Sequence, residues 1–476
     1  MRNKICFYIL IVFIITFLIV FTLAPRCKFL METEKSKWPP PQILYKDVSL
    51  WPVLCKNNKV YVLATEGSTK FGDGPILFFI YDLKEGKWYG PERIGERLNN
   101  EILSHNRELV KKKYDLYEPD DYFRIYFPEF DVDEEGRVHI FYGGAYEIDE
   151  VEIRGVPPPI TTKMYLIYAR REPDGGWEEQ IFKSFPPDEY PIYPLENTGI
   201  YMPRTYPHWV SAFGRKLAVG YSIIYHLVLK PIDQYGAPER NYIYIVRNED
   251  RNWEEYNLVE LLPEVKEVGT DPFGADVGSI GEDGNVYVVI WQGPTIDTKG
   301  IEVKALLLKI DTKEKRLKWI RRMKELEVEK VNIYEEPLAG VLDNFVMKVK
   351  GNKFYYASIW RGKIYLHSWE LIGDDIGNIV WEFVSNVAWF INLSMDVKKN
   401  VYLLNALNLH RKEGNRWIME DVLDGETQRK YKIGTIHWQT MCVDDEGYAW
   451  VFFLAEDQSQ YPRFVKNIYY VRKKVE

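Results

Sequence analysis

The residues best suited to chemistry lie in six short segments, and each segment leads into a predicted β-strand. The segments combine arginine, carboxylates, histidine and aromatic rings, and their candidates are Arg124, Glu129, Arg204, Tyr206, His208, Asp271, Asp276, Asp343, Asn344, His437 and Trp438. An arginine can hold a carboxylate through two parallel hydrogen bonds. Aromatic walls with a few polar groups suit a small organic ligand. The mixture therefore predicts a ligand-binding rim that suits an acidic sugar.

One chemistry open to this rim is the elimination carried out by a polysaccharide lyase. Arg204 would neutralise the carboxylate of a uronate, and Tyr206 would act as the acid. His208 or His437 would act as the base. These residues are candidates for catalysis as well as for binding.

The alternative is that position 208 belongs to a repeated strand and has no catalytic role. The tripeptide Pro-His-Trp at 207–209 aligns with Pro-Glu-Phe at 128–130. Glu129 and His208 would then occupy equivalent polar positions that face a common channel.

Metal ions, cofactors and nucleic acids are not expected from the composition. The seven histidines never fall in a spacing such as HxxxH. The net charge is −8, acids and bases are interspersed, and the sequence contains no basic stripe. Lys, Glu, Tyr and Ile are abundant while Gln is scarce, a bias that resembles proteins of hyperthermophiles.

The elements that would position the rim are β-hairpins. Seven segments show alternating apolar residues on both sides of a Gly, Asn or Asp turn, and they span 53–64, 130–142, 210–221, 277–291, 345–358, 393–405 and 441–453. A second hairpin follows each of the first six and closes on tryptophan, at Trp88, Trp177, Trp253, Trp319, Trp381 and Trp417. The seventh second hairpin starts at 465 and lacks its last strand.

The N-terminal tail supplies the missing strand. "SKWPPPQIL" at 36–44 repeats the Lys-Trp-x-x-Pro pattern of "GKWYGPERI" at 86–94, so Trp38 corresponds to Trp88. Pairing the first strand beside the last closes a ring and removes exposed sheet edges. The sequence therefore predicts an all-β protein, a seven-bladed β-propeller over residues 37–476 closed by an N-terminal strand.

The second repeat also carries a family resemblance. "FPEFDVDEEGRVHIFYGGA" followed by "KMYLIYARREPDGGWEEQIF" resembles the sialidase-like propellers built of neuraminidase-type repeats. The resemblance is strongest there and extends loosely over about residues 37–476. That superfamily includes glycosidases, polysaccharide lyases and glycan-binding domains, so it implies the fold but not the function.

A retaining sialidase would use three arginines, a Tyr–Glu pair and an acidic Asp. The sequence offers two rim arginines, Arg124 and Arg204, and no evident glutamate partner for Tyr206. We therefore expect a binding or scaffolding module for glycan or a cell-envelope protein. The alternative is a sialidase-like glycosidase or polysaccharide lyase acting on acidic glycans.

The N-terminus predicts attachment to a membrane. Residues 5–24 are almost entirely apolar and long enough to cross a bilayer, between a short cytoplasmic segment (1–4) and a linker (25–36). We expect a single-pass signal-anchor in the cell membrane that holds the propeller outside the cytoplasm. A cleaved signal peptide is the alternative.

Two further features remain open in the sequence. Cys55 and Cys442 could pair in an oxidising compartment, but lone cysteines in strands are more often core residues. Residues 96–114 predict an amphipathic helix between the first two repeats. That helix would either cover the channel mouth or lie on an outer edge.

Overall fold

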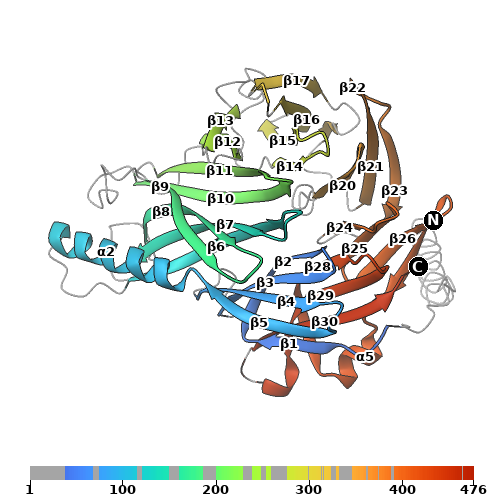
Figure 1. Cartoon of the computed structure of the whole chain (residues 1–476), viewed down its shortest axis with the longest axis horizontal. Helices are drawn as coiled ribbons and strands as arrows, with labels where there is room; N and C mark the ends of the chain where they lie inside the picture. Colours follow the sequence, from blue (N-terminus) through green and yellow to red (C-terminus); the bar gives the residue numbers. More distant parts are fainter. Residues whose placement is uncertain are drawn as a thin grey trace, which may run out of the picture.

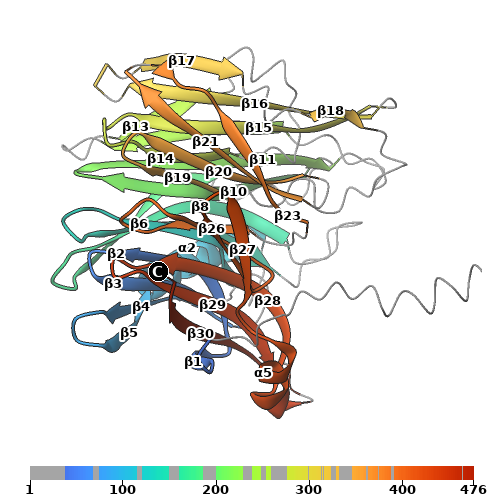
Figure 2. The same cartoon turned by 90° about the vertical axis from the view of Figure 1, so that its right-hand side faces the viewer.

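The computed structural model describes residues 38–67, 74–114, 121–148, 160–185, 200–228, 239–247, 253–258, 276–297, 300–311, 313–314, 316–322, 328–331, 346–360, 363–373, 375–386, 391–461, 463 and 465–475. The described strands form seven antiparallel sheets arranged around a centre (Figure 1). In the view turned by 90°, most strands run across the picture, broadly along the viewing direction of Figure 1 (Figure 2). The predicted all-β propeller is confirmed.

The first four sheets follow one another along the chain. The first holds β2 (Val48–Lys56), β3 (Lys59–Glu66), β4 (Ile76–Asp82) and β5 (Lys87–Ile94). The second holds β6 (Asp121–Val132), β7 (Val138–Ile148), β8 (Ile160–Arg171) and β9 (Trp177–Phe185). The third holds β10 (Ile200–Phe213), β11 (Lys216–Val228), β12 (Glu239–Arg247) and β13 (Trp253–Asn257). The fourth holds β14 (Asp276–Ile280), β15 (Val286–Asp297), β16 (Gly300–Asp311) and β17 (Arg316–Arg322), with β18 (Val328–Val331) beside β16.

The last three sheets complete the ring. The fifth holds β19 (Val346–Lys350), β20 (Lys353–Trp360), β21 (Lys363–Ile372) and β22 (Asp375–Ile376), with β23 (Val380–Ser385) beside β21. The sixth holds β24 (Ile391–Met395), β25 (Val401–Asn405), β26 (Asn408–Glu413) and β27 (Arg416–Asp421). The seventh holds β28 (Ile433–Val443), β29 (Tyr448–Asp457), β30 (Lys466–Lys474) and β1 (Gln42–Lys46). Helix α5 (Gly425–Lys430) leads into β28, and η2 (Gln458–Gln460) follows β29.

The first strand of each sheet lies innermost, and these strands contact one another in a closed circle. The order is β2, β6, β10, β14, β19, β24, β28 and back to β2. The tail closes this circle at the periphery, because β1 pairs antiparallel with β30 through Gln42 opposite Tyr470 and Lys46 opposite Asn467. The Lys-Trp-x-x-Pro repeat thus predicts the closing strand correctly.

The repeated tryptophan fastens neighbouring sheets. Trp88 of the first sheet packs against Trp450 of the seventh and donates its Nε1–H to the Tyr470 hydroxyl at 3.2 Å. Trp38 is buried in a cluster with sixth- and seventh-sheet residues, including Leu404. Trp381 differs, because it is 59% exposed. The side chain of Trp319 lies outside the described residues. Five other tryptophans pack toward the preceding sheet, and they are Trp38, Trp88, Trp177, Trp253 and Trp417.

The acidic turns between first and second strands are structural. Asp444 accepts two backbone N–H groups and, at 2.8 Å, the indole N–H of Trp450 six residues later. Asp396 holds the hydroxyl of Tyr402 in the same way at 3.1 Å. These buried carboxylates satisfy the turn amides, which explains the repeated Asp-x-x-Gly or Asp-x-x-x-Asn pattern without catalysis.

The predicted helix forms as α2 (Glu96–Tyr114). It contacts β6 and β7 and extends outward at the edge of the ring (Figure 1). Leu98 and Ile102 are buried there, and Asn106 Nδ2 donates to the Tyr165 hydroxyl at 2.6 Å. The helix therefore lies on an outer edge, not over the channel.

The predicted membrane segment, residues 5–24, lies outside the described residues, as does the linker 25–36. Among the described helices, none is long and apolar enough to span a bilayer.

Candidate functional site

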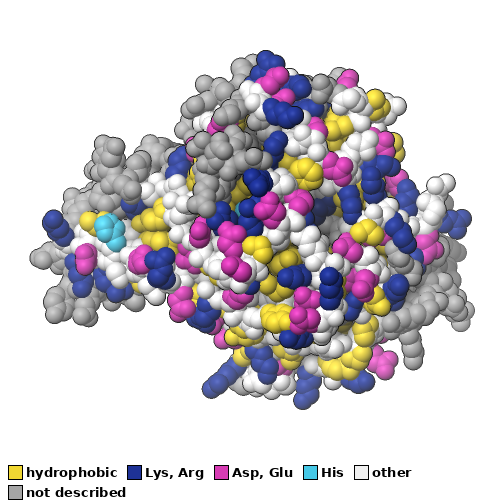
Figure 3. Space-filling view, in the orientation of Figure 1, with side chains coloured by type: hydrophobic (Ala, Val, Ile, Leu, Met, Phe, Trp, Pro, Cys, Tyr) yellow, Lys and Arg dark blue, Asp and Glu magenta, His cyan; other side chains and the backbone are white. Residues whose placement is uncertain are grey.

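A cavity of about 390 Å³ lies where the innermost strands of all seven sheets meet. Its aromatic lining comes from Trp51, Phe127, Phe130, Trp209 and Trp438. Its charged and polar lining includes Glu129, His208, Lys348, Lys350 and Asn392. We call this the central cavity. On the face drawn in Figure 3, acidic and basic side chains are interspersed around the ring.

Bulges in the inner strands place the polar residues of the central cavity. Register shifts occur between Tyr126 and Glu129 in β6 and between Pro207 and Trp209 in β10. Phe127, in the first of these bulges, adopts φ +43°. Bulges re-aim side chains locally, and proline is tolerated there because it has no N–H to contribute to the ladder.

Glu129 and His208 therefore line one cavity from neighbouring sheets. This agrees with the alignment of their two tripeptides in the sequence. A repeated strand position carries a carboxyl group in one sheet and an imidazole in the next.

Glu129 has an unusual electrostatic environment. Burial raises the pKa of Glu129 to about 8, and the nearby Lys348 ammonium opposes the shift without cancelling it. The carboxyl group is thus mostly protonated at neutral pH, and it can donate a hydrogen bond. A titratable group perturbed in this way inside a cavity is a candidate for function.

The sequence analysis did not identify several lining residues. Lys348 and Lys350 alternate with apolar residues along β19. Trp51 lies in the bulge of β2. Lys350 Nζ donates to the Asp396 carbonyl at 2.8 Å. Their signal in the sequence was their place near the start of the predicted hairpins at 53–64 and 345–358.

Arg124 lies elsewhere than the central cavity. Its Nη1 is 3.3 Å from Glu147 Oε2, and the Tyr126 hydroxyl donates to Glu147 Oε1. Glu147 is only 2% exposed. The structure therefore contains a Tyr–Glu pair beside an arginine, which the sequence did not reveal because the two residues come from different strands. Burial and the charge of Glu147 raise the pKa of Tyr126 far above its usual value, which keeps the phenol protonated.

The two candidate residues in β28, His437 and Trp438, lie in different surroundings. Trp438 lines the central cavity, whereas His437 Nε2 lies 2.9 Å from Glu456 Oε1 of β29. His437 is not among the cavity-lining residues.

Some predicted residues lie outside the described part of the chain. They are Asp271, Asp343 and Asn344 in full, together with the side chains of Arg204, Tyr206 and Asp276. Among the described residues, no group of three or more His, Cys, Asp or Glu side chains is placed to hold a metal ion.

The wall of the central cavity also contains a disulfide. Cys55 of β2 and Cys442 of β28 are bonded, with their Cα atoms 5.4 Å apart. It joins the first and seventh sheets, a pairing that the sequence left undecided.

No protein-family model matches this chain, and no curated protein matches it in sequence. Trypanosoma rangeli sialidase in complex with the inhibitor DANA is similar at 12% identity and TM-score 0.41, over 73% of this chain and 54% of the sialidase. A thermostable family-43 glycoside hydrolase is similar at 11% identity and TM-score 0.30, over 74% of this chain and 91% of that one. The Pyrococcus horikoshii acylaminoacyl peptidase is similar at 11% identity and TM-score 0.34, over 77% and 47%.

The present chain spans about half the length of the sialidase that it matches. This similarity concerns the fold alone.

Proposed function

We propose that this propeller binds an acidic glycan in its central cavity. The observation that carries the proposal is the convergence in one cavity of aromatic side chains from several sheets, two lysines of β19 and the carboxyl group of Glu129, whose pKa is raised. Its volume, about 390 Å³, falls within the range of small-molecule sites.

The charge of the lining favours an anionic ligand. With Glu129 protonated, Lys348 and Lys350 are the charged groups that remain in the described lining. Lys350 Nζ already donates to the Asp396 carbonyl, so we assign the sugar carboxylate to Lys348, whose charge also acts on Glu129. Trp51, Phe127 and Trp438 offer apolar surface to sugar rings.

A carbohydrate-active enzyme, either a glycosidase or a lyase, is the second candidate. The raised pKa of Glu129 favours it, because a general acid must hold its proton at the working pH. His208, in the same cavity, is the candidate base, and Arg204 and Tyr206 belong to the same strand, β10. Binding remains the preferred function, because Arg124 and His437 pair with carboxylates outside the cavity lining.

A glycan array and a polysaccharide-depolymerisation assay on the full-length protein separate the two. Binding without turnover, weakened at least tenfold by Lys348→Ala and unchanged by Lys363→Ala, supports the binding module. Lys363 is a suitable control because it is exposed on β21. Turnover abolished by Glu129→Gln, His208→Ala or Arg204→Ala would establish the enzyme instead. Neither binding nor turnover in these assays would rule out both the glycan-binding module and the enzyme, and it would point to a cell-envelope protein as the partner.

We also propose that residues 5–24 anchor the seven-bladed ring outside the cytoplasm, through the linker 25–36. The Cys55–Cys442 disulfide supports this location, since disulfides persist mainly in oxidising compartments. Protease treatment of intact cells should release the propeller. Recovery of the protein in the soluble cytosolic fraction would contradict the proposal.

A further inference from the structure

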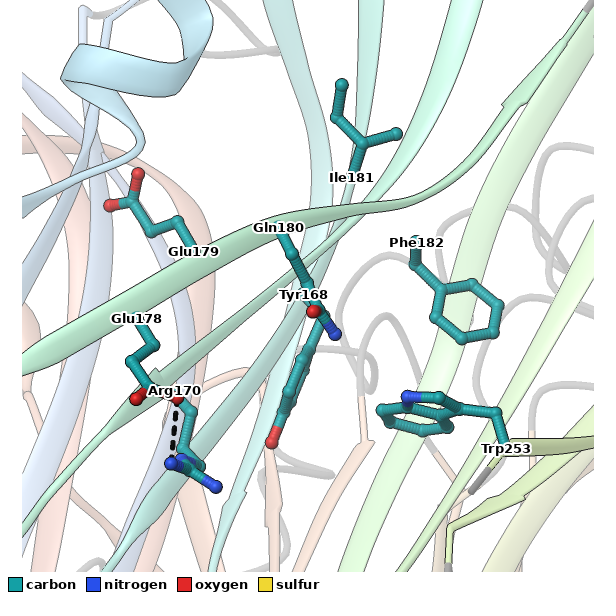
Figure 4. Close-up of a pocket in the computed structure, with 8 residues that line it drawn as sticks. All are labelled: Tyr168, Arg170, Glu178, Glu179, Gln180, Ile181, Phe182 and Trp253. Atoms are coloured by element: carbon teal, nitrogen blue, oxygen red, sulfur yellow. Dashed lines mark hydrogen bonds and ion pairs between the residues drawn. The ribbon is translucent and has the colours of Figure 1, made fainter. Parts of the chain in front are cut away.

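A second pocket lies between the second and third sheets, away from the central cavity. It has a volume of about 360 Å³ and is lined by Tyr168, Arg170, Glu178, Glu179, Gln180, Ile181, Phe182 and Trp253 (Figure 4). We call it the inter-sheet pocket. Its walls are the outer strands β8 and β9 and the start of β13.

This pocket occupies a position that repeats around the ring. Trp177 packs edge-on against Phe78 at the junction of the first and second sheets, with ring centroids 5.5 Å apart. Trp253 packs in the same way against Tyr168 at the next junction, at 5.4 Å. The two junctions can therefore be compared residue by residue.

At the first junction, a carboxylate closes the space beside the tryptophan. Glu92, opposite Phe78 in the ladder, accepts the Trp177 indole N–H at 2.7 Å. It also accepts hydrogen bonds from Nε and Nη2 of Arg171, both at 2.8 Å. At the second junction, the residue opposite Tyr168 is Gln180. An amide therefore stands at this junction where the first junction has a carboxylate, and the inter-sheet pocket lies beside it.

Carboxylates outnumber cations around the inter-sheet pocket, because its lining holds one arginine, Arg170, and two glutamates, Glu178 and Glu179. Arg170, only 8% exposed, places its Nη2 2.8 Å from Glu178 and 2.7 Å from Glu172. Its Nε is buried and has no hydrogen-bond partner within the described residues. Two carboxylates around one guanidinium disfavour an anionic ligand, and the guanidinium disfavours a cation. A neutral ligand rich in hydroxyl groups avoids both repulsions and can form hydrogen bonds with the guanidinium and with the carboxylates.

The opposite wall is aromatic. The rings of Phe182 and Trp253 meet edge-on at 5.0 Å, and both side chains are half-buried. Figure 4 shows Phe182, Gln180 and Tyr168 arrayed on the side of β9 and β8 where Trp253 lies. Aromatic surface beside donors and acceptors is the combination that recognises an amphipathic ring.

We propose that the inter-sheet pocket binds a neutral sugar ring. Its apolar face would pack on Trp253 and Phe182, and its hydroxyl groups would bond to the Gln180 amide and to the Arg170–Glu178 pair. This site goes beyond the proposed function and is independent of it, because none of its lining residues lines the central cavity.

The test is ligand-observed NMR on the full-length protein with the methyl glycosides of glucose, galactose, mannose, fucose and N-acetylglucosamine. We expect saturation transfer to at least one of them, and at least tenfold weaker binding in Gln180→Trp, which places a large ring in the pocket. Met419→Trp, which alters an exposed residue of the equivalent outer strand β27, should bind like wild type. Glu178→Gln should also weaken binding, and its 61% side-chain exposure makes folding secure.

Two results would overturn the proposal: no glycoside receives saturation, or Gln180→Trp binds as tightly as wild type. The central cavity is tested separately, because Lys348→Ala should leave the neutral glycosides bound. Conversely, Gln180→Trp should leave acidic glycans bound in the central cavity.

Discussion

Cys55 and Cys442 are bonded across the junction of the first and last sheets, although 387 residues separate them in the sequence. The same junction is closed at its outer side by β1, which pairs with β30. The ring is therefore closed by a disulfide bond near its centre and by strand pairing at its periphery.

Removing the disulfide should destabilise the ring without changing its fold. The bond closes a long loop, so it restricts the unfolded chain, and its loss should cost about 2–5 kcal/mol. The Cys55→Ser/Cys442→Ser variant should melt at a lower temperature than wild type under non-reducing conditions. Added reductant should lower the wild-type midpoint to that of the variant and leave the variant unchanged. Non-reduced peptide mapping that finds no peptide linking the two cysteines would contradict the assignment.

Removing the closing strand should be more damaging. A protein that begins at residue 48 lacks β1 and the buried Trp38, so it exposes the edge of β30. We expect it to aggregate or to melt far below a protein that begins at residue 30. Equal melting temperatures would show that the tail does not close the ring.

The sequence alone could predict the elements that repeat. Alternation around a turn marks each inner hairpin, and Trp88 and Trp177 stand at the start of the outermost strands β5 and β9, where the sequence placed the ends of the outer hairpins. The helix at 96–114 was predictable with its bounds, because its apolar residues recur at helical spacing. These are local patterns, and repetition makes them reliable.

What the sequence could not predict depends on residues brought together from separate strands. The Tyr126–Glu147 bond joins two strands of one sheet, and nothing in the spacing marks it. The pKa of Glu129 depends on its burial and on Lys348, from a distant sheet. At the inter-sheet pocket, Gln180 stands where a neighbouring sheet has Glu92. A contact between strands becomes visible only when their register is known.

The repeated tryptophans should differ in importance according to their burial. Trp177 contacts Phe78 and donates to Glu92, so Trp177→Ala should cost about 3 kcal/mol by opening a cavity and leaving Glu92 short of a donor. Trp381 occupies a similar place in its sheet but is 59% exposed, so Trp381→Ala should change stability by less than about 0.5 kcal/mol. Chemical denaturation of the two variants provides the comparison. Equal losses of unfolding free energy in the two variants would mean that Trp177 does not stabilise the protein through inter-sheet packing.

Glu129 should make stability fall as the solution becomes alkaline. Its pKa in the folded protein is about 8, above the ordinary value of 4.5, so between these values the folded state holds a proton that the unfolded state releases. This contribution is complete below about pH 4.5 and declines by a few kcal/mol as the pH rises to about 8. Glu129→Gln, which keeps the shape of the neutral carboxyl, should match wild type near pH 4.5 and be more stable near pH 9. Exposed Glu426→Gln serves as the control and should follow wild type throughout. Urea denaturation at both pH values decides the matter, and a Glu129→Gln variant no more stable than wild type near pH 9 would mean that the carboxyl ionises normally.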